Sequence, residues 1–440
     1  MPRSTRRRAV ATLVATALTA LATLSTSAPP AAAAVHDGTR FYVPPANPDA
    51  VRQIARLRAH RQHADARRIR TLTETPTAVW VESGSPKGVR KEVRQLTREA
   101  ARERTVPLLV LYNIPFRDCS QYSSGGATSV AQYQDWIDGV ARGIGRREVA
   151  IALEPDSIGI IPWYTTLDGV QEWCQPAEAD AATAAQDRFT MLRYAVDRLT
   201  ALPRTSVYLD GTHSGWLNVG DVSDRLLKAG VQKTDGFFMN ASNYQWTSNL
   251  EQYGTWISSC LAYVTEVKPG DFASCGNQYW SGGPANDFTG VTLDPAEVWS
   301  DTAADPTANT AGINSRYAAL LGDVRPSKTF LIDTSRNGRG PWVPSAQQQA
   351  DWPDPQDWCN PPDRGLGFRP TTRTRSPLAD AYVWIKVPGE SDGQCSRGLG
   401  TGDDVVDPVW GRVDPDAGLW FPAQALELAR LADPPLRGRR

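Results

Sequence analysis

Two carboxylates close together at the end of an apolar run are the first residues that could do chemistry. The run 151-IALEPDSIG-159 carries Glu154 and Asp156 with Pro155 between them. Its apolar character predicts a buried strand, and Pro155 disfavours helical geometry at Glu154. In an extended segment the two carboxylates would share a face. Spacing alone therefore does not choose between them.

Six further apolar runs end in the same way. Almost every run has acidic, basic or aromatic residues at or just after its end, with Gly or Pro beside them. The runs are 77–81, 106–114, 149–155, 206–211, 236–240, 328–335 and 382–387. The reactive side chains at their ends include Glu82, Arg117, Asp333 and Arg336. One such Asp is ordinarily a turn former or a helix cap, but a ring of charged residues predicts a site.

Helical patterns separate the apolar runs, as at 129–144 and 182–202, and 49–72 has amphipathic helical spacing at Val51, Ile54 and Leu57. Strands that alternate with helices predict a parallel sheet buried on both faces. With about seven units, we expect an α/β fold, a distorted parallel β/α barrel with its active site at the carboxyl ends of the strands. An open doubly wound sheet is the alternative, but its GxGxxG and P-loop fingerprints are absent.

The ring of carboxylates suits glycoside hydrolysis better than other hydrolytic chemistry. The chain has neither a GxSxG nor an HExxH motif. It has fifteen Trp, whose flat apolar faces stack well on sugar rings. Glycoside hydrolysis needs one protonated carboxylic acid and a carboxylate or water relay. A metal-dependent hydrolase and a non-catalytic glycan-binding protein are the alternatives.

The N-terminus has the pattern of an export signal. MPRSTRRR is basic, an apolar stretch follows, and STSAPPAAAA ends near Ala34. This predicts a signal peptide over residues 1–34, by either the Sec or the twin-arginine route, and one catalytic domain over 35–440. The apolar stretch falls short of the about 20 residues that a membrane anchor needs. A net charge of -1 gives no bias toward nucleic acid. We expect a secreted, extracellular monomer.

Six cysteines in an exported chain predict disulfides. Cys260 and Cys275 are the obvious local pair, and the loop they close is worth about 3 kcal/mol in the chain-entropy model. A zinc site is disfavoured because no CxxC spacing occurs and the chain has only four histidines. We therefore expect neither a metal nor a cofactor.

Six motifs in one order resemble the family 6 glycoside hydrolases, which are inverting cellulases. They lie between about Trp80 and Trp420: YNIPFRDC, LEPDSI, YLDGTHSGW, NASNY, IDTSRNGRGP and WIKVPGESDG. The resemblance implies a distorted barrel of about seven strands. It also implies hydrolysis of a β-1,4-glucan polysaccharide with inversion.

Residue roles follow from the same resemblance. It implies that Asp156 is the general acid, that Asp118 raises the pKa of Asp156 and connects to a water relay, and that Tyr112 presses on a distorted sugar. Asp392 matches the proposed base, a role that stays open. The implied sugar-binding residues are Trp80, Asp210, His213, Trp216, Asn243, Trp358, Lys386 and Glu390. The implied disulfides are Cys119–Cys174 and Cys359–Cys395. Glu154 is then a structural partner at the end of its strand.

Two departures from the family pattern bear on activity. The chain reaches Cys395 directly after GESDGQ, where cellobiohydrolases of the family carry a longer insertion that roofs a tunnel. A short loop implies an open cleft and favours an endoglucanase over a cellobiohydrolase. The segment 260–310 is unusual and could add a lid. Asn113 stands where an Asp is often found, and it removes no catalytic candidate.

Overall fold

The computed structural model describes residues 1, 33–400 and 404–436. The predicted signal peptide lies outside the described residues except for its first residue and its last two. Ala34 is buried, and its N–H donates to Ser206 Oγ at 2.9 Å. The helices and strands described below belong to one compact unit, Ala32–Arg440. In the described part, no helix has the length and apolar character needed to cross a membrane.

Seven parallel strands form one curled sheet, and their order in the sheet follows their order in the chain. The strands are β1 (Val79–Val81), β2 (Leu108–Leu111), β3 (Val149–Leu153), β4 (Thr205–Asp210), β5 (Gly236–Met239), β6 (Thr329–Asp333) and β7 (Ala379–Val383). Sequential order is that of a barrel, because a doubly wound sheet starts in its middle. The predicted distorted barrel is therefore confirmed.

The two edge strands of the sheet, β1 and β7, approach each other. Ala78 N–H donates to the carbonyl of Trp384 at 2.8 Å, and the indole N–H of Trp80 donates to the carbonyl of Ile385 at 2.9 Å. Successive strand side chains alternate between two cores, as the pleat requires. Leu109 and Ile151 pack in the core shared with the helices, whereas Leu108 and Ala150 belong to a smaller core inside the sheet's curve.

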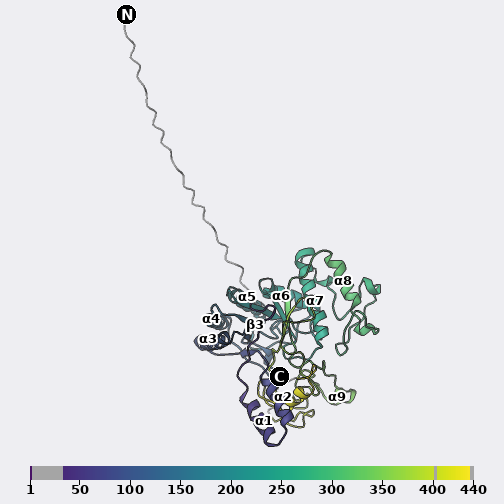
Figure 1. Ribbon diagram of the computed structural model, residues 1–440. Coiled ribbons are helices and arrows are strands. Elements are labelled where there is room, and N and C mark those ends of the chain that lie inside the picture. Colours follow the sequence, from purple (N-terminus) through teal and green to yellow (C-terminus); the bar gives the residue numbers. More distant parts are fainter. Residues whose placement is uncertain (2–32, 401–403, 437–440) are drawn as a thin grey trace. The chain divides into compact units, whose positions relative to one another are not determined.

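Helices follow the strands and pack on one another in chain order from α3 to α8 (Figure 1). The α-helices are α1 (Pro48–Ala59), α2 (His63–Thr73), α3 (Pro86–Glu103), α4 (Val130–Ile144), α5 (Ala184–Thr200), α6 (Val219–Ala229), α7 (Thr247–Ala262), α8 (Ala311–Leu321), α9 (Ala346–Asp351) and α10 (Pro422–Arg430). Ser85, Ser129 and Asn218 begin α3, α4 and α6, and each side chain accepts a first-turn N–H. A third core, around Trp384 and Trp420, joins α1, α2 and α10.

Two predicted boundaries were wrong. The stretch 49–72 holds two helices, and between them Arg61 has a φ of 59°. Val51 is also 51% exposed, so it is not on the buried face. The last strand ends at Val383, although the apolar run continues to Val387. The N–H groups of Ile385 and Lys386 donate to the carboxylate of Asp333 at 3.2 and 3.0 Å, which replaces the strand ladder.

Candidate active site

A cleft of about 880 Å³ lies at the carboxyl ends of the strands, and the loops after all seven strands contribute to its lining. The sequence-predicted site residues that line it are Trp80, Tyr112, Asp118, Asp156, His213, Trp216, Asn243, Trp358, Lys386, Glu390 and Asp392. Asp210 is the exception, because it is 2% exposed and lies behind the lining. The barrel thus brings together residues that are more than 300 positions apart in the chain.

A tight turn after β3 separates the two carboxylates of the LEPDS motif. The φ angles of Glu154 and Asp156 are 53° and 63°, so the expected extended geometry was wrong. Ser157 N–H donates to the carbonyl of Glu154, and Ile160 N–H donates to that of Asp156 at 2.7 Å. Non-glycine residues in this region carry strain and tend to occur at functional sites. The turn sends one carboxylate into the core and the other into the cleft.

Glu154 is fully buried and serves as a backbone acceptor. Its Oε2 accepts the N–H groups of Asn113 and Ile114 at 2.9 and 3.0 Å. These residues begin the loop after β2, which carries Asp118. Glu154 therefore ties the loop after β2 to the turn after β3, and it does not line the cleft.

Asp156 is partly exposed to the cleft and surrounded by other acids. Burial raises the pKa of Asp156 well above its usual value, Asp210 and Asp118 raise it further, and Arg188 opposes them. Burial also raises the pKa of Asp210 to about 7 and that of Asp118 to about 6. Removal from water and like charges both disfavour a carboxylate. These surroundings favour the protonated form of Asp156.

Asp392 has cations as neighbours, whereas Asp156 has acids. Its carboxylate contacts Arg336 Nη1 at 2.8 Å and Lys386 Nζ at 3.3 Å. It also accepts the hydroxyl of Tyr244 at 3.1 Å and the N–H of Asn360 at 3.0 Å. Burial alone would raise the pKa of Asp392, but the two cations and these donors hold it below its usual value. Asp392 is therefore ionised.

Aromatic rings line the cleft on both sides of Asp156. The rings of Trp80 and Tyr112 meet edge to face, with centroids 5.5 Å apart. Trp216 lies 5.7 Å from the ring of His213, and a Cβ on Gly159 would lie 2.3 Å from its Cη2, so only glycine fits beneath it. Burial lowers the pKa of His213 to about 4, so this ring is neutral and suited to hydrogen bonding with a sugar hydroxyl.

Sequence reasoning missed several residues of the cleft lining. Tyr122, Trp173 and Trp342 line it without belonging to any predicted set. Their loops carry no recognisable spacing. The wealth of Trp was noted, but it does not say which Trp face the cleft.

Four arginines are fully buried beneath the rim: Arg188, Arg225, Arg336 and Arg397. Of these, sequence reasoning singled out Arg336 and missed the other three. Arg188, for example, donates to the carbonyls of Pro115, Ser157 and Ile160 at 2.8 to 2.9 Å. A signal for Arg188 was present. It lies 4, 7 and 11 residues before Leu192, Ala195 and Leu199, on the buried face of α5.

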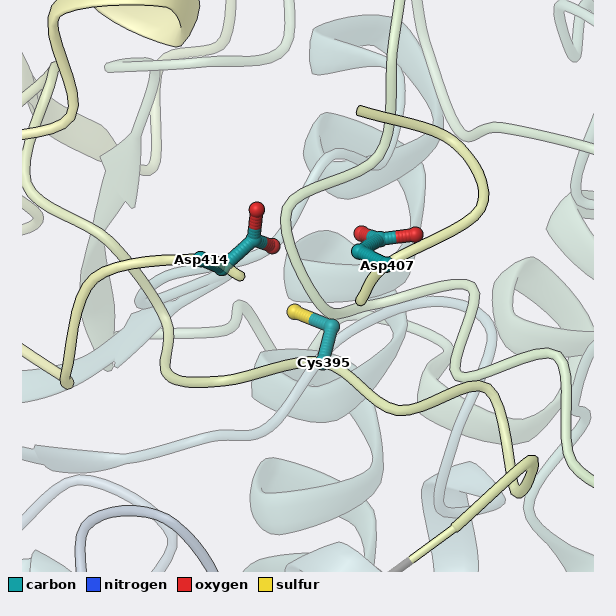
Figure 2. Close-up of side chains that lie close together, drawn as sticks. All are labelled: Cys395, Asp407 and Asp414. Atoms are coloured by element: carbon teal, nitrogen blue, oxygen red, sulfur yellow. The ribbon is translucent and has the colours of Figure 1, made fainter. Parts of the chain in front are cut away.

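One group of side chains of the metal-binding type lies close together in the described residues: Cys395, Asp407 and Asp414 (Figure 2). The sulfur of Cys395 is bonded to Cys359, and Asp407 accepts Arg397 Nη2 at 2.8 Å. Burial raises the pKa of Asp414 to about 7, and Asp407 raises it too. Because other partners engage these groups, we assign no metal to them.

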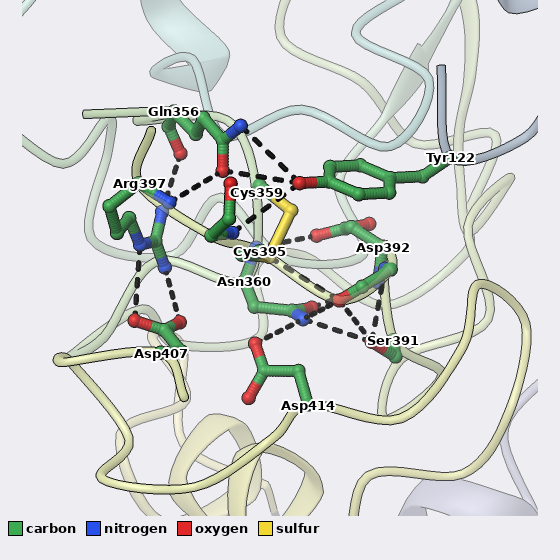
Figure 3. Close-up of a disulfide and its surroundings, with 12 residues drawn as sticks. Tyr122, Gln356, Cys359, Asn360, Ser391, Asp392, Cys395, Arg397, Asp407 and Asp414 are labelled. Atoms are coloured by element: carbon green, nitrogen blue, oxygen red, sulfur yellow. Dashed lines mark hydrogen bonds and ion pairs between the residues drawn. A yellow bond between two sulfur atoms is a disulfide. The ribbon is translucent and has the colours of Figure 1, made fainter. Parts of the chain in front are cut away.

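Three disulfides are present, and they are the three predicted pairs: Cys119–Cys174, Cys260–Cys275 and Cys359–Cys395. The first joins the loop after β2 to the loop after β3. The third joins the loops after β6 and β7. Beside it, the Asn360 N–H donates to the carboxylate of Asp392, and the Asn360 side-chain oxygen accepts the N–H of Asp392 (Figure 3). Two of the three disulfides therefore fix the loops that carry candidate catalytic residues.

Loops from opposite sides of the rim meet at Tyr122. Its hydroxyl contacts the Gln356 side chain at 3.3 Å (Figure 3). Its ring lies 6.0 Å from that of Trp358, and its hydroxyl accepts the Ser396 N–H at 3.4 Å. Tyr122 follows β2, whereas the other three residues follow β6 and β7. The short loop after β7 predicted an open cleft, and these contacts connect two of the loops that line it.

A model of "Glycosyl hydrolases family 6" matches residues 36–432. This chain belongs to glycosyl hydrolase family 6. It is therefore a glycoside hydrolase, as the motifs predicted.

Two sequence relatives and one solved structure each match most of this chain. The chain is similar to endoglucanase A of Cellulomonas fimi, with 30% identity over 359 residues, which is 81% of this chain and 55% of that protein. It is 26% identical to a probable 1,4-β-D-glucan cellobiohydrolase C of Neosartorya fischeri, over 82% of this chain and 71% of that one. The endoglucanase Cel6 of Mycobacterium tuberculosis, solved with a thio-linked cellobioside, aligns with a TM-score of 0.60 and 30% identity, over 90% and 97% of the two chains.

Proposed function

We propose that this protein is a secreted endo-β-1,4-glucanase that hydrolyses internal bonds of cellulose or a related β-glucan with inversion. The observation that carries the proposal is the pair of opposite carboxylate environments in one aromatic cleft. Asp156 is set to hold a proton, and Asp392 is set to remain ionised. The relatives named endoglucanase support the substrate. Three disulfides support export to an oxidising compartment, after removal of a signal peptide over 1–34 from a single catalytic domain.

In the proposed reaction, a glucan chain stacks on Trp80, Trp216 and Trp358 across the rim. Asp156 donates its proton to the glycosidic oxygen, and Tyr112 presses on the distorted sugar. A water attacks the anomeric carbon from the opposite face. An inverting enzyme seats that water between carboxyls roughly 6.5–9.5 Å apart. His213, Asn243, Lys386 and Glu390 hydrogen-bond the sugar hydroxyls.

The acceptor of the water's proton is either Asp392 or a water chain that ends at Asp118. The two ion pairs of Asp392 hold its pKa low and make it a weak base. The pKa of Asp118, raised by burial to about 6, lies nearer to neutrality, where a proton acceptor is more effective. This comparison favours Asp118 as the final proton acceptor. Asp392 then serves to hold Arg336 and Lys386 in position. Asp210 acts through Asp156 and not on the sugar, because it does not line the cleft.

A cellobiohydrolase of the same family is the second candidate, and the contact of Tyr122 with Gln356 and Ser396 favours it. A cleft closed at that point would thread a chain from its end. The short loop after β7 and the cited relatives named endoglucanase favour the endo reading.

The test is product analysis on amorphous cellulose and carboxymethyl-cellulose. An endoglucanase gives a rapid fall in viscosity for few new reducing ends and a mixture of oligosaccharides. Nearly pure cellobiose with a slow fall in viscosity would establish the cellobiohydrolase. Proton NMR of early products should show the α-anomer, and a β-anomer would exclude inversion.

A further inference from the structure

A hairpin over residues 163–174, between β3 and α5, stands beside the cleft. Thr165 pairs with Gln171 in antiparallel register. Trp163 N–H donates to the carbonyl of Cys174, and Glu172 N–H donates to that of Tyr164, both at 2.9 Å. Because side chains alternate along a strand, residues 172 and 174 share one face of the hairpin and Trp173 takes the other.

The inner face of the hairpin is fastened to the catalytic loops. Cys174 is fully buried and bonded to Cys119, the neighbour of Asp118. Glu172 accepts Arg225 Nη2 at 2.5 Å, and the Arg225 side chain is fully buried. Arg225 also donates to the carbonyl of Ile158 at 2.8 Å, in the turn that carries Asp156. The hairpin is therefore held in register with both Asp118 and Asp156.

The outer face presents Trp173 to the cleft. Trp173 is 57% exposed and belongs to the cleft lining. Leu167 and Val170, nearer the hairpin tip, are equally exposed but do not line the cleft. A large apolar ring held rigidly in water loses little entropy on binding and offers a flat face for the C–H groups of a sugar. The hairpin thus combines a fixed backbone with an unpartnered aromatic ring at the substrate path.

We propose that Trp173 is a stacking platform for one glucosyl unit of the substrate, a binding subsite supplied by this hairpin. The inference rests on the proposed function, because it takes a β-glucan as the ligand. Trp173 has no ionisable group and so cannot act as an acid or base, which leaves it a role in affinity and chain length preference.

The test compares the W173A variant with the L167A control from the same hairpin. W173A should raise KM for cellohexaose and amorphous cellulose by about tenfold and change kcat less. W173Y, which keeps a ring, should recover most of the affinity, whereas W173L, which keeps only apolar bulk, should not. L167A should match the wild type throughout.

Binding without turnover provides a second readout. Calorimetric titration of cellohexaose into D156N and into the double variant D156N/W173A should show a loss of affinity of about tenfold in the double variant. Equal affinities, or W173A kinetics equal to those of L167A, overturn the inference. If the alanine variant fails to fold, the W173L and W173Y pair decides the question alone, and equal KM values for the two overturn it. A wild-type enzyme inactive on every β-1,4-glucan would instead overturn the proposed function.

Discussion

Asp156 and Asp392 are both enclosed by protein at the same rim, yet their surroundings act in opposite directions. Asp156, after β3, has Asp210 and Asp118 as neighbours, and its pKa is raised. Asp392, after β7, has Arg336 and Lys386 as neighbours, and its pKa is lowered. Enclosure raises the pKa in both cases, so the neighbouring charges decide the outcome.

The comparison shows that the immediate neighbours of each carboxyl decide its protonation. Asp156 has Asp118 and Asp210 beside it, whereas Asp392 is flanked by Arg336 and Lys386. A glycosidic bond between them would meet a proton donor on one side and a fixed anion on the other. Four substitutions test this difference, in order of expected effect.

Asp156→Asn should cause the largest loss. An amide cannot donate the proton that the leaving group needs, so kcat on carboxymethyl-cellulose should fall by about 10² to 10⁴-fold, while substrate binding persists. Reducing-sugar release and binding to insoluble cellulose measure the two. Thermal stability should hold or rise, because an amide cannot ionise in surroundings that disfavour the charged form of Asp156. Full activity in this variant would remove Asp156 as the acid.

Asp392→Ala should instead act on stability. It leaves Arg336, which is fully buried, without its partner, and an unpaired buried charge costs about 3–5 kcal/mol of unfolding free energy. Urea denaturation at pH 7 measures the change, with the exposed Asp323→Ala as control. A carboxylate with a lowered pKa stabilises the fold above its ordinary pKa of 3.8. The difference between variant and wild type should therefore shrink as the pH falls below that value, and a difference independent of pH would contradict the ion-pair account.

Asp210→Asn should produce a smaller effect, visible in the pH profile of kcat. It removes the largest charge effect on Asp156, so the pKa of Asp156 falls and the alkaline limb of the profile moves to lower pH. Asp118→Asn should move the limb in the same direction by less, whatever it does to the absolute rate. A limb that stays in place in both variants would show that the acidic neighbours do not tune Asp156.

The composition of the rim was predictable because it follows from chain chemistry. Parallel strands put their carboxyl ends together, so Trp80, Asp118 and Asp392 could be assigned to one cleft from sequence. The sequence could not distinguish residues that line the cleft from residues buried behind the lining, and Asp210 is an example. Asp210 is the last residue of β4, three residues before His213, yet it is buried behind the lining.

The turn at Glu154 was not predictable, because tertiary contacts override the local preference. Pro155 favours an extended residue before it, but the Glu154 carboxylate gains two backbone N–H donors from the loop after β2 only in the turned conformation. Trp173 and Tyr122 were missed for a related reason. Their positions depend on a disulfide and on contacts between loops that are far apart in the chain.

The four buried arginines beneath the rim have a consequence for behaviour on heating. Each donates to a carbonyl of a rim loop: Arg188 to Pro115, Ser157 and Ile160, Arg225 to Ile158, Arg336 to Ser242, and Arg397 to Pro355 and Gln356. The penalty for taking a charge out of water falls as temperature rises, while hydrophobic stabilisation levels off. We therefore expect warming to weaken the guanidinium contacts of the rim loops less than the aliphatic packing of the barrel.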